Sequence, residues 1–214
     1  MPDYKIVRWD ETNFDVNQIP YTSEAYKAKK WAYVSDYARM KVLYDSGGVY
    51  LDTDVELIKS LEPIIEKGAF MACERHSNFA PYPGVATGLG IATDAHNPLY
   101  KEILDYYENI HFCGASTGLT VVEHVTSVLI RRGLMPTSEF QTLDGVNIYP
   151  PDFFCPFDEM NRISITSNTV AIHHYAGSWL GKSEKMKKKI VHLLGPRITF
   201  FILRIKACLR ERIH

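Results

Sequence analysis

Two aspartates that stand one residue apart, Asp52 and Asp54, are the side chains of this sequence best suited to chemistry. They follow an apolar run, V-Y-L, which predicts a strand over residues 49–58 with both carboxylates on one face, ~7 Å apart along it. Two carboxylates so placed repel each other unless a cation lies between or in front of them. Their hard oxygens suit Mn²⁺ or Mg²⁺, which commonly also hold phosphate oxygens. A solvated turn is the alternative for an isolated D-x-D.

A carboxylate and a guanidinium precede this pair on a predicted helix. Asp36 and Arg39 are three residues apart and therefore share one helix face. A neighbouring face of the helix carries an apolar stripe that we expect to pack on the sheet, formed by Val34, Ala38 and Val42. Gly47-Gly48 ends the helix and brings the strand straight back past it. The four charged side chains can therefore converge on one pocket, although a surface salt bridge would also explain Asp36 and Arg39.

The segment over residues 35–56 resembles the DXD region of the family 32 glycosyltransferases. This family includes bacterial capsular-polysaccharide sugar transferases, yeast-type initiating α-1,6-mannosyltransferases and, more distantly, clostridial glucosylating toxins. The pattern S-D-x-x-R and then L-x-x-x-G-G-x-Y-x-D-x-D is matched at Ser35, Asp36, Arg39, Leu43, Gly47, Gly48, Tyr50, Asp52 and Asp54. Residues 147–156 (NIYPPDFFCP) and 172–179 (IHHYAGSW) resemble two later family elements in the same order. The resemblance covers about residues 4–182.

The resemblance implies an α/β fold of the GT-A type, a Rossmann-like mixed sheet flanked by helices. It implies a retaining transfer of a sugar from a UDP- or GDP-sugar donor to a growing surface, capsular or lipid-linked glycan, with Mn²⁺ or Mg²⁺ bound. Family members usually begin with a strand of the type K-I-I-H-x-x-W-x-G. This sequence starts just after that element, so we expect the first strand to be missing.

The same resemblance assigns roles to the residues around the D-x-D. Asp54 would bind the metal, and Asp52 would approach the metal and the donor ribose or phosphates. Asp36 and Arg39 would hold hydroxyls of the donor sugar, and Tyr50 would pack near the donor.

The late element supplies the rest of the expected site. His174 would be a metal ligand, with Ser178 and Trp179 beside the diphosphate. His173 is the alternative ligand, because strand alternation turns only one of the two histidines inward. The sequence identifies no inverting-type base, and the candidate residues on the acceptor side are Glu74, Asp94 and Thr117.

Alternating helices and strands must position these residues, which predicts an α/β fold. Helices are expected from an N-cap at Ser23 to about residue 46, over residues 61–66, after Asn97-Pro98 and over residues 118–132. Strands are expected over residues 4–9, 49–58, 69–73, 146–149 and 170–174.

The composition of the chain excludes several classes of protein. The 214 residues are 46% hydrophobic, enough for one sizeable core, and the net charge of −1 argues against a nucleic-acid-binding protein. The four cysteines form no C-x-x-C pair and are best explained as reduced thiols of a cytosolic protein. No apolar run reaches the roughly 18–20 residues that a spanning helix needs.

The charge is unevenly distributed along the chain. Residues 182–214 contain ten Lys or Arg against two Asp or Glu, which leaves 14 basic and 23 acidic residues in residues 1–181. We therefore expect a glycosyltransferase domain over residues 1–181 and a basic amphipathic tail over residues 182–214. Such a tail would hold the protein on the anionic inner face of the cell membrane. A terminal helix packed on the domain is the alternative.

Two further functions compete with the transferase. One is a truncated, catalytically inactive GT-A-like protein that binds nucleotides or glycans, and the other is a metal-dependent phosphohydrolase that uses the same D-x-D.

Overall fold

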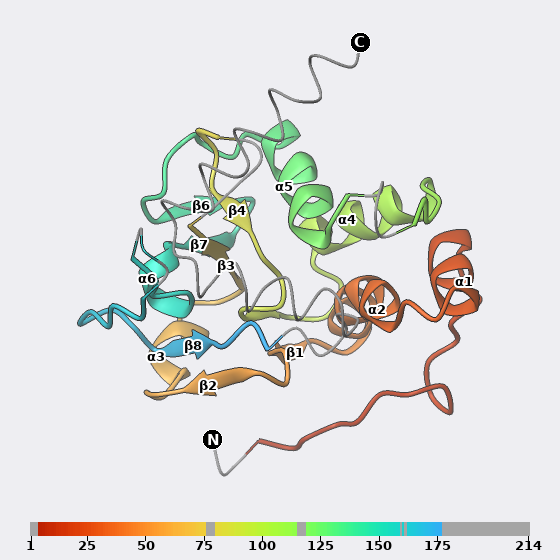
Figure 1. Cartoon of the computed structure of the whole chain (residues 1–214), viewed down its shortest axis with the longest axis horizontal. Coiled ribbons are helices and arrows are strands. Elements are labelled where there is room, and N and C mark those ends of the chain that lie inside the picture. Colours follow the sequence, from red (N-terminus) through yellow and green to blue (C-terminus); the bar gives the residue numbers. More distant parts are fainter. Residues whose placement is uncertain (1–3, 76–79, 115–118, 159, 161, 177–214) are drawn as a thin grey trace, which may run out of the picture. The chain divides into compact units, whose positions relative to one another are not determined.

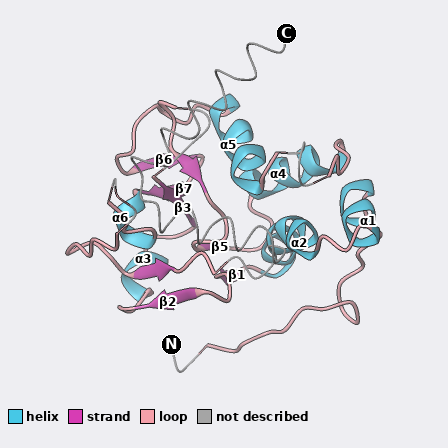
Figure 2. Ribbon diagram, in the orientation of Figure 1, coloured by secondary structure: helices cyan, strands magenta, loops and turns pink. Residues whose placement is uncertain are grey.

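A mixed sheet with helices on both sides forms the centre of the described chain (Figures 1 and 2). The computed structural model describes residues 4–75, 80–114, 119–158, 160 and 162–176. Expectations for Thr117, Ser178, Trp179 and the tail over residues 182–214 therefore lie outside the described residues.

The main sheet has the strand order β1-β5-β3-β7-β6, with β4 added beside β3. Its strands are β1 (Gly48–Tyr50), β3 (Phe70–Glu74), β4 (Gly84–Val85), β5 (Ile91–Thr93), β6 (Gln141–Leu143) and β7 (Val146–Tyr149). Strands β3 and β7 run parallel, and the other pairs are antiparallel. The predicted mixed α/β fold, consistent with a GT-A-like arrangement, is confirmed.

Both faces of this sheet are apolar because successive side chains of a strand point to opposite sides. Met71 and Cys73 of β3 belong to one hydrophobic cluster, whereas Phe70 and Ala72 belong to a second. The first cluster lies under α1 (Pro20–Lys27), α2 (Trp31–Ser46), α4 (Pro98–Glu108) and α5 (Val121–Arg131). The second lies under α3 (Glu62–Ile65) and α6 (Pro151–Phe154). The sheet is therefore a rigid layer held from both sides.

The expected strand over residues 49–58 is divided in two, which corrects the sequence prediction. β1 pairs with β5, whereas β2 (Val55–Leu57) pairs with β8 (Ala171–His173) in a separate two-stranded sheet. The chain must bend between two sheets, and it does so at Asp52, whose carbonyl accepts the Val55 N–H at 3.0 Å. Asp52 and Asp54 thus lie in a turn, not on one strand face.

The helices before the turn also differ from the prediction. The single helix expected over residues 23–46 is two helices, because the chain between them passes through Lys29 in a left-handed conformation (φ 58°). α1 begins at Pro20 and not at an N-cap Ser23. The apolar side chains that α2 buries are mainly Tyr33, Tyr37, Met40 and Leu43, and only one residue of the expected stripe is buried, Val34.

Residues 4–9 form no strand in the structure, so the prediction of a strand there was wrong. These residues form no ladder, and Ile6 is 94% exposed.

Two further observations concern the described residues as a whole. No helix among them is both long and apolar enough to cross a bilayer. Cys73 and Cys155 are buried, Cys113 is exposed, and the three form no disulfide.

The start of α4 follows the sequence prediction and allows a test. The Asn97 side chain accepts the Leu99 N–H at 3.0 Å and caps the helix before Pro98. We expect Asn97→Ala to lower the free energy of unfolding by about 1 kcal/mol, because the cap's hydrogen bond is lost. Urea denaturation measures this change, and Asn97→Asp, which keeps an acceptor oxygen, is the control. An equal loss in both variants would contradict a capping role.

Candidate active site

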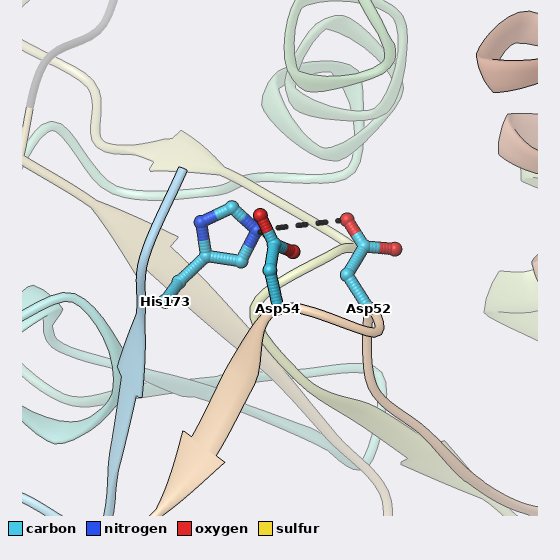
Figure 3. A group of neighbouring side chains, drawn as sticks. All are labelled: Asp52, Asp54 and His173. Atoms are coloured by element: carbon cyan, nitrogen blue, oxygen red, sulfur yellow. Dashed lines mark ion pairs between the residues drawn. The ribbon is translucent and has the colours of Figure 1, made fainter. Parts of the chain in front are cut away.

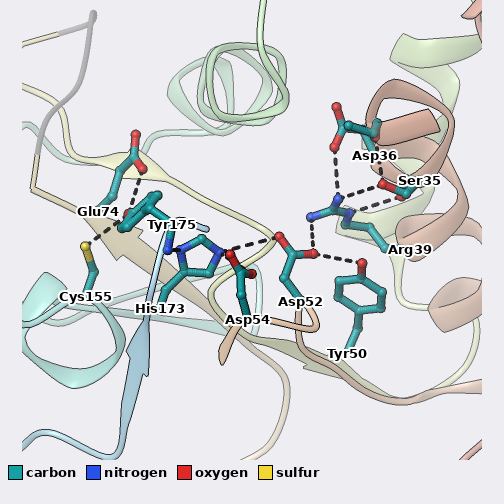
Figure 4. Close-up of polar contacts among 11 residues, drawn as sticks. Ser35, Asp36, Arg39, Tyr50, Asp52, Asp54, Glu74, Cys155, His173 and Tyr175 are labelled. Atoms are coloured by element: carbon teal, nitrogen blue, oxygen red, sulfur yellow. Dashed lines mark hydrogen bonds and ion pairs between the residues drawn. The ribbon is translucent and has the colours of Figure 1, made fainter. Parts of the chain in front are cut away.

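Asp52 is the residue at which the polar contacts of the turn meet (Figure 4). Its Oδ1 accepts the Tyr50 hydroxyl at 2.8 Å and lies 3.2 Å from Nη1 of Arg39. Its Oδ2 lies 3.7 Å from Nε2 of His173. The two carboxylate oxygens therefore face different partners, one toward α2 and one toward β8.

The guanidinium of Arg39 is buried and held by α2 itself. Its Nη2 donates to Oδ1 of Asp36 at 3.0 Å and to the Ser35 hydroxyl at 3.1 Å, and its Nε donates to the Ser35 carbonyl at 3.0 Å. These contacts exist because residues three and four apart on a helix are neighbours. The guanidinium also lies over the Tyr50 ring, 4.9 Å from its centroid. The predicted association of Asp36, Arg39 and Asp52 is present in the structure.

The two carboxylates that share Arg39 have opposite pKa shifts. Burial raises the pKa of Asp36 to about 6, against the opposing effect of Arg39 and with a further upward contribution from the negative charge of Asp52. Burial also tends to raise the pKa of Asp52. Hydrogen bonds from His173 and Tyr50 and the charge of Arg39 outweigh the effect of burial, so that the pKa of Asp52 lies below its usual value. As the pH falls from neutrality, Asp36 therefore takes up its proton before Asp52 does.

Asp52, Asp54 and His173 form a cluster that fits a divalent cation (Figure 3). One ligand atom from each lies within 4.8 Å of the other two, and Nε2 of His173 is 3.1 Å from Oδ1 of Asp54. Two carboxylates with one imidazole are ligands that suit Mn²⁺ and similar ions. The antiparallel register of β2 and β8 sets Val55 opposite His173 and so brings the histidine to the turn.

His173, and not His174, occupies the position that the sequence assigned to the late metal ligand. Nε2 of His174 lies 2.8 Å from Oε2 of Glu56, and both side chains are exposed. The cause is the alternation of β8, which turns His173 toward the D-x-D and His174 away from it. The choice of His174 is corrected accordingly.

Tyr175 contacts His173 through both its ring and its backbone N–H, and the sequence prediction did not include this residue. The Tyr175 ring packs edge-on against His173 with centroids 4.1 Å apart, and its hydroxyl lies 3.2 Å from Glu74 and 3.1 Å from the Cys155 sulfur. The Tyr175 N–H donates to Nδ1 of His173 at 3.2 Å, which places the proton of a neutral ring on Nε2. Coordination through Nε2 requires that proton to move to Nδ1, and the Tyr175 N–H contact would then be released.

The expected residues on the acceptor side are dispersed. Glu74 accepts a hydrogen bond from the Tyr175 hydroxyl, and burial raises the pKa of its carboxyl. Asp94 is exposed at the end of β5, beside the backbone of Gly47.

Comparison with known proteins supports the resemblance over the first third of the chain. A family model described as "Glycosyltransferase sugar-binding region containing DXD motif" matches residues 1–71. The matched segment contains Asp36, Arg39, Tyr50, Asp52 and Asp54, whereas His173 lies beyond it. No curated protein matches the chain. The DXD segment is thus similar to that of glycosyltransferases, and it contains Ser35, Asp36 and Asp52, the polar partners of Arg39 described above.

The raised pKa of Asp36 predicts a pH dependence of stability. A carboxyl that binds its proton more tightly when folded contributes stability below its unfolded pKa of 3.8, and this contribution is lost as the pH rises through about 6. We expect the free energy of unfolding of the wild type, relative to Asp36→Asn, to fall between about pH 4 and pH 7. Urea titrations at several pH values measure it, and Asp45→Asn, an exposed position on α2, is the control. A difference that rises over this range would contradict the prediction.

Proposed function

We propose that this protein is a metal-dependent glycosyltransferase that uses a nucleotide-sugar donor. The observation that carries the proposal is the junction at Asp52. One oxygen of this carboxylate belongs to the Arg39–Asp36 pair, and the other faces the cluster with Asp54 and His173. A site for sugar hydroxyls and a site for a cation therefore share one side chain. The family match over residues 1–71 supports the same activity.

Each side chain has a definite task in this proposal. Asp52, Asp54 and His173 hold the cation, whose charge stabilises the diphosphate as it leaves the sugar. Asp36 and Arg39 bind hydroxyls of the donor sugar through a carboxyl and a guanidinium that burial holds in place. Tyr50 orients Asp52 through its hydroxyl.

Several finer assignments belong to this proposal and rest on the sequence resemblance. They are a UDP- or GDP-sugar donor, a retaining hexosyl transfer, a capsular or lipid-linked glycan acceptor, and contacts of Ser178 and Trp179 with the diphosphate. A position at the cytoplasmic membrane face through the basic tail over residues 182–214 is also proposed, from the charge of that segment.

The metal site is tested by the two adjacent histidines. We expect His173→Gln to weaken Mn²⁺ binding about tenfold or more, since loss of even an outer partner of a metal site costs about 10–100-fold in affinity. His174→Gln should leave the affinity unchanged, because that ring contacts Glu56 instead. Calorimetric titration with Mn²⁺ makes the measurement. A larger effect of His174→Gln would show that the cation lies elsewhere.

The activity is tested by release of nucleoside diphosphate from a panel of UDP- and GDP-sugars with Mn²⁺. We expect release from one donor, and loss of that release both in Asp54→Asn and after chelation of the metal, because the leaving diphosphate then lacks its counter-charge.

The outcomes separate the competing functions. If no donor in the panel releases its nucleoside diphosphate although the protein still binds Mn²⁺ and a nucleoside diphosphate, the proposed transferase activity is contradicted. An inactive binding protein is then favoured. Phosphate release from simple phosphoesters would instead favour a phosphohydrolase.

A further inference from the structure

Gly88 is a buried residue in the turn between β4 and β5, and its backbone lies directly against Asp52. Its carbonyl accepts the Asp52 N–H at 3.0 Å, so the two backbones are joined at the point where β1 ends. The turn that contains Gly88 therefore lies directly against the Asp52 carboxylate.

A side chain at position 88 cannot coexist with the observed Asp52 carboxylate. A Cβ there would lie 2.2 Å from Oδ2 of Asp52, 2.9 Å from its Cγ and 3.1 Å from Nη1 of Arg39. The φ of Gly88 is not in the left-handed region, so the backbone conformation does not itself call for glycine. What favours glycine here is the space taken by the Asp52 carboxylate and, at a longer distance, by the Arg39 guanidinium.

Asp52 is held too firmly to move aside without loss. Its Oδ1 is bound by Tyr50 and Arg39, and its N–H is bound by Gly88 itself. The atom that a methyl group would displace is Oδ2, the oxygen that faces His173. Displacement would therefore act first on the face of Asp52 turned toward the cation cluster.

We propose that Gly88 is a positioning residue. Because it has no side chain, Oδ2 of Asp52 can occupy the position in which it faces Asp54 and His173. The expected effect of Gly88 on cation and donor affinity rests on the proposed function. The effect of Gly88 on the position of the Asp52 carboxylate concerns the folded protein alone. Gly88 lies beyond the segment that the family model matches, and nothing in the sequence pattern pointed to it.

Gly90 offers a matched control two residues further along the same segment. A Cβ at Gly90 would meet ring atoms of Phe154 at 2.8 and 3.0 Å and the side chain of Leu51 at 3.2 Å. Gly90→Ala therefore disturbs the hydrophobic cluster under α6 and not the carboxylate. Both substitutions crowd a buried position, but only Gly88→Ala crowds Asp52.

The first experiment is Mn²⁺ titration of the full chain. We expect Gly88→Ala to weaken Mn²⁺ binding about tenfold or more, as loss of an outer support of a metal ligand does, and Gly90→Ala to bind as the wild type does. Unchanged affinity in a folded Gly88→Ala protein would overturn the proposal.

The second experiment is a double-mutant cycle in thermal stability without metal. Asp52→Ala removes both Asp52 atoms that the Cβ would meet, so Gly88→Ala should lower the Tm much less in this background than in the wild type. An equal loss of Tm in both backgrounds would overturn the proposal. If Gly88→Ala alone does not fold, recovery of a folded protein when Asp52→Ala is added would support the proposal, and failure to recover a fold that Asp52→Ala alone retains would overturn it.

The two experiments keep the proposals distinguishable. Absence of Mn²⁺ binding by the wild type would contradict the proposed function, and the cycle would still decide whether Gly88 seats Asp52.

Discussion

The arrangement of the site depends on the buried guanidinium of Arg39 between Asp36 and Asp52. A charge buried this deeply is tolerated only with well-placed partners, and removal of one partner of such a pair costs about 3–5 kcal/mol. Apolar side chains of similar volume could fill the same space with equal stability. The contacts of Arg39 with Asp36 and Asp52 are therefore better explained by the orientation that they give to the Asp52 carboxylate than by a gain in stability. It fixes one oxygen of Asp52 toward α2 and leaves the other facing β8.

Burial of Asp36 and the additional partners of Asp52 give the two carboxylates beside this guanidinium different pKa values. Asp36 is buried on a helix and has its pKa raised to about 6, whereas Asp52 has its pKa lowered by His173, Arg39 and Tyr50. An anionic Asp52 is suited to a cation. Asp36 can exchange a proton near neutral pH and is suited to hydrogen bonds with hydroxyls, which both donate and accept. In the proposed function, one connected network would thus bind both a cation and the hydroxyls of a sugar.

The rest of the fold positions the side chains of this network. The sheet is packed on both faces, and its β1 strand ends at the turn that contains the D-x-D. The short sheet of β2 and β8 then brings His173 beside that turn from a distant part of the chain. Tyr175 contacts the histidine through its ring and its backbone N–H, and Gly88 leaves room for the Asp52 carboxylate.

The sequence by itself determined the parts of the site that are local. Asp36 and Arg39 are paired by helical spacing, and the double glycine returns the chain to place Asp52 beside them. These contacts depend on short-range geometry, which a pattern of residues specifies. Helix α4 with its cap at Asn97 and strand β7 were predictable for the same reason.

Only the tertiary structure decided the contacts between distant segments. The division of residues 49–58 into two strands followed from pairing with β5 and β8, which a local pattern does not contain. The choice of His173 over His174 depended on the register of β8, because a shift of one residue exchanges the two faces of a strand. The role proposed for Gly88 depends on the close approach of its backbone to the Asp52 side chain, and a glycine in a sequence does not reveal what lies against it.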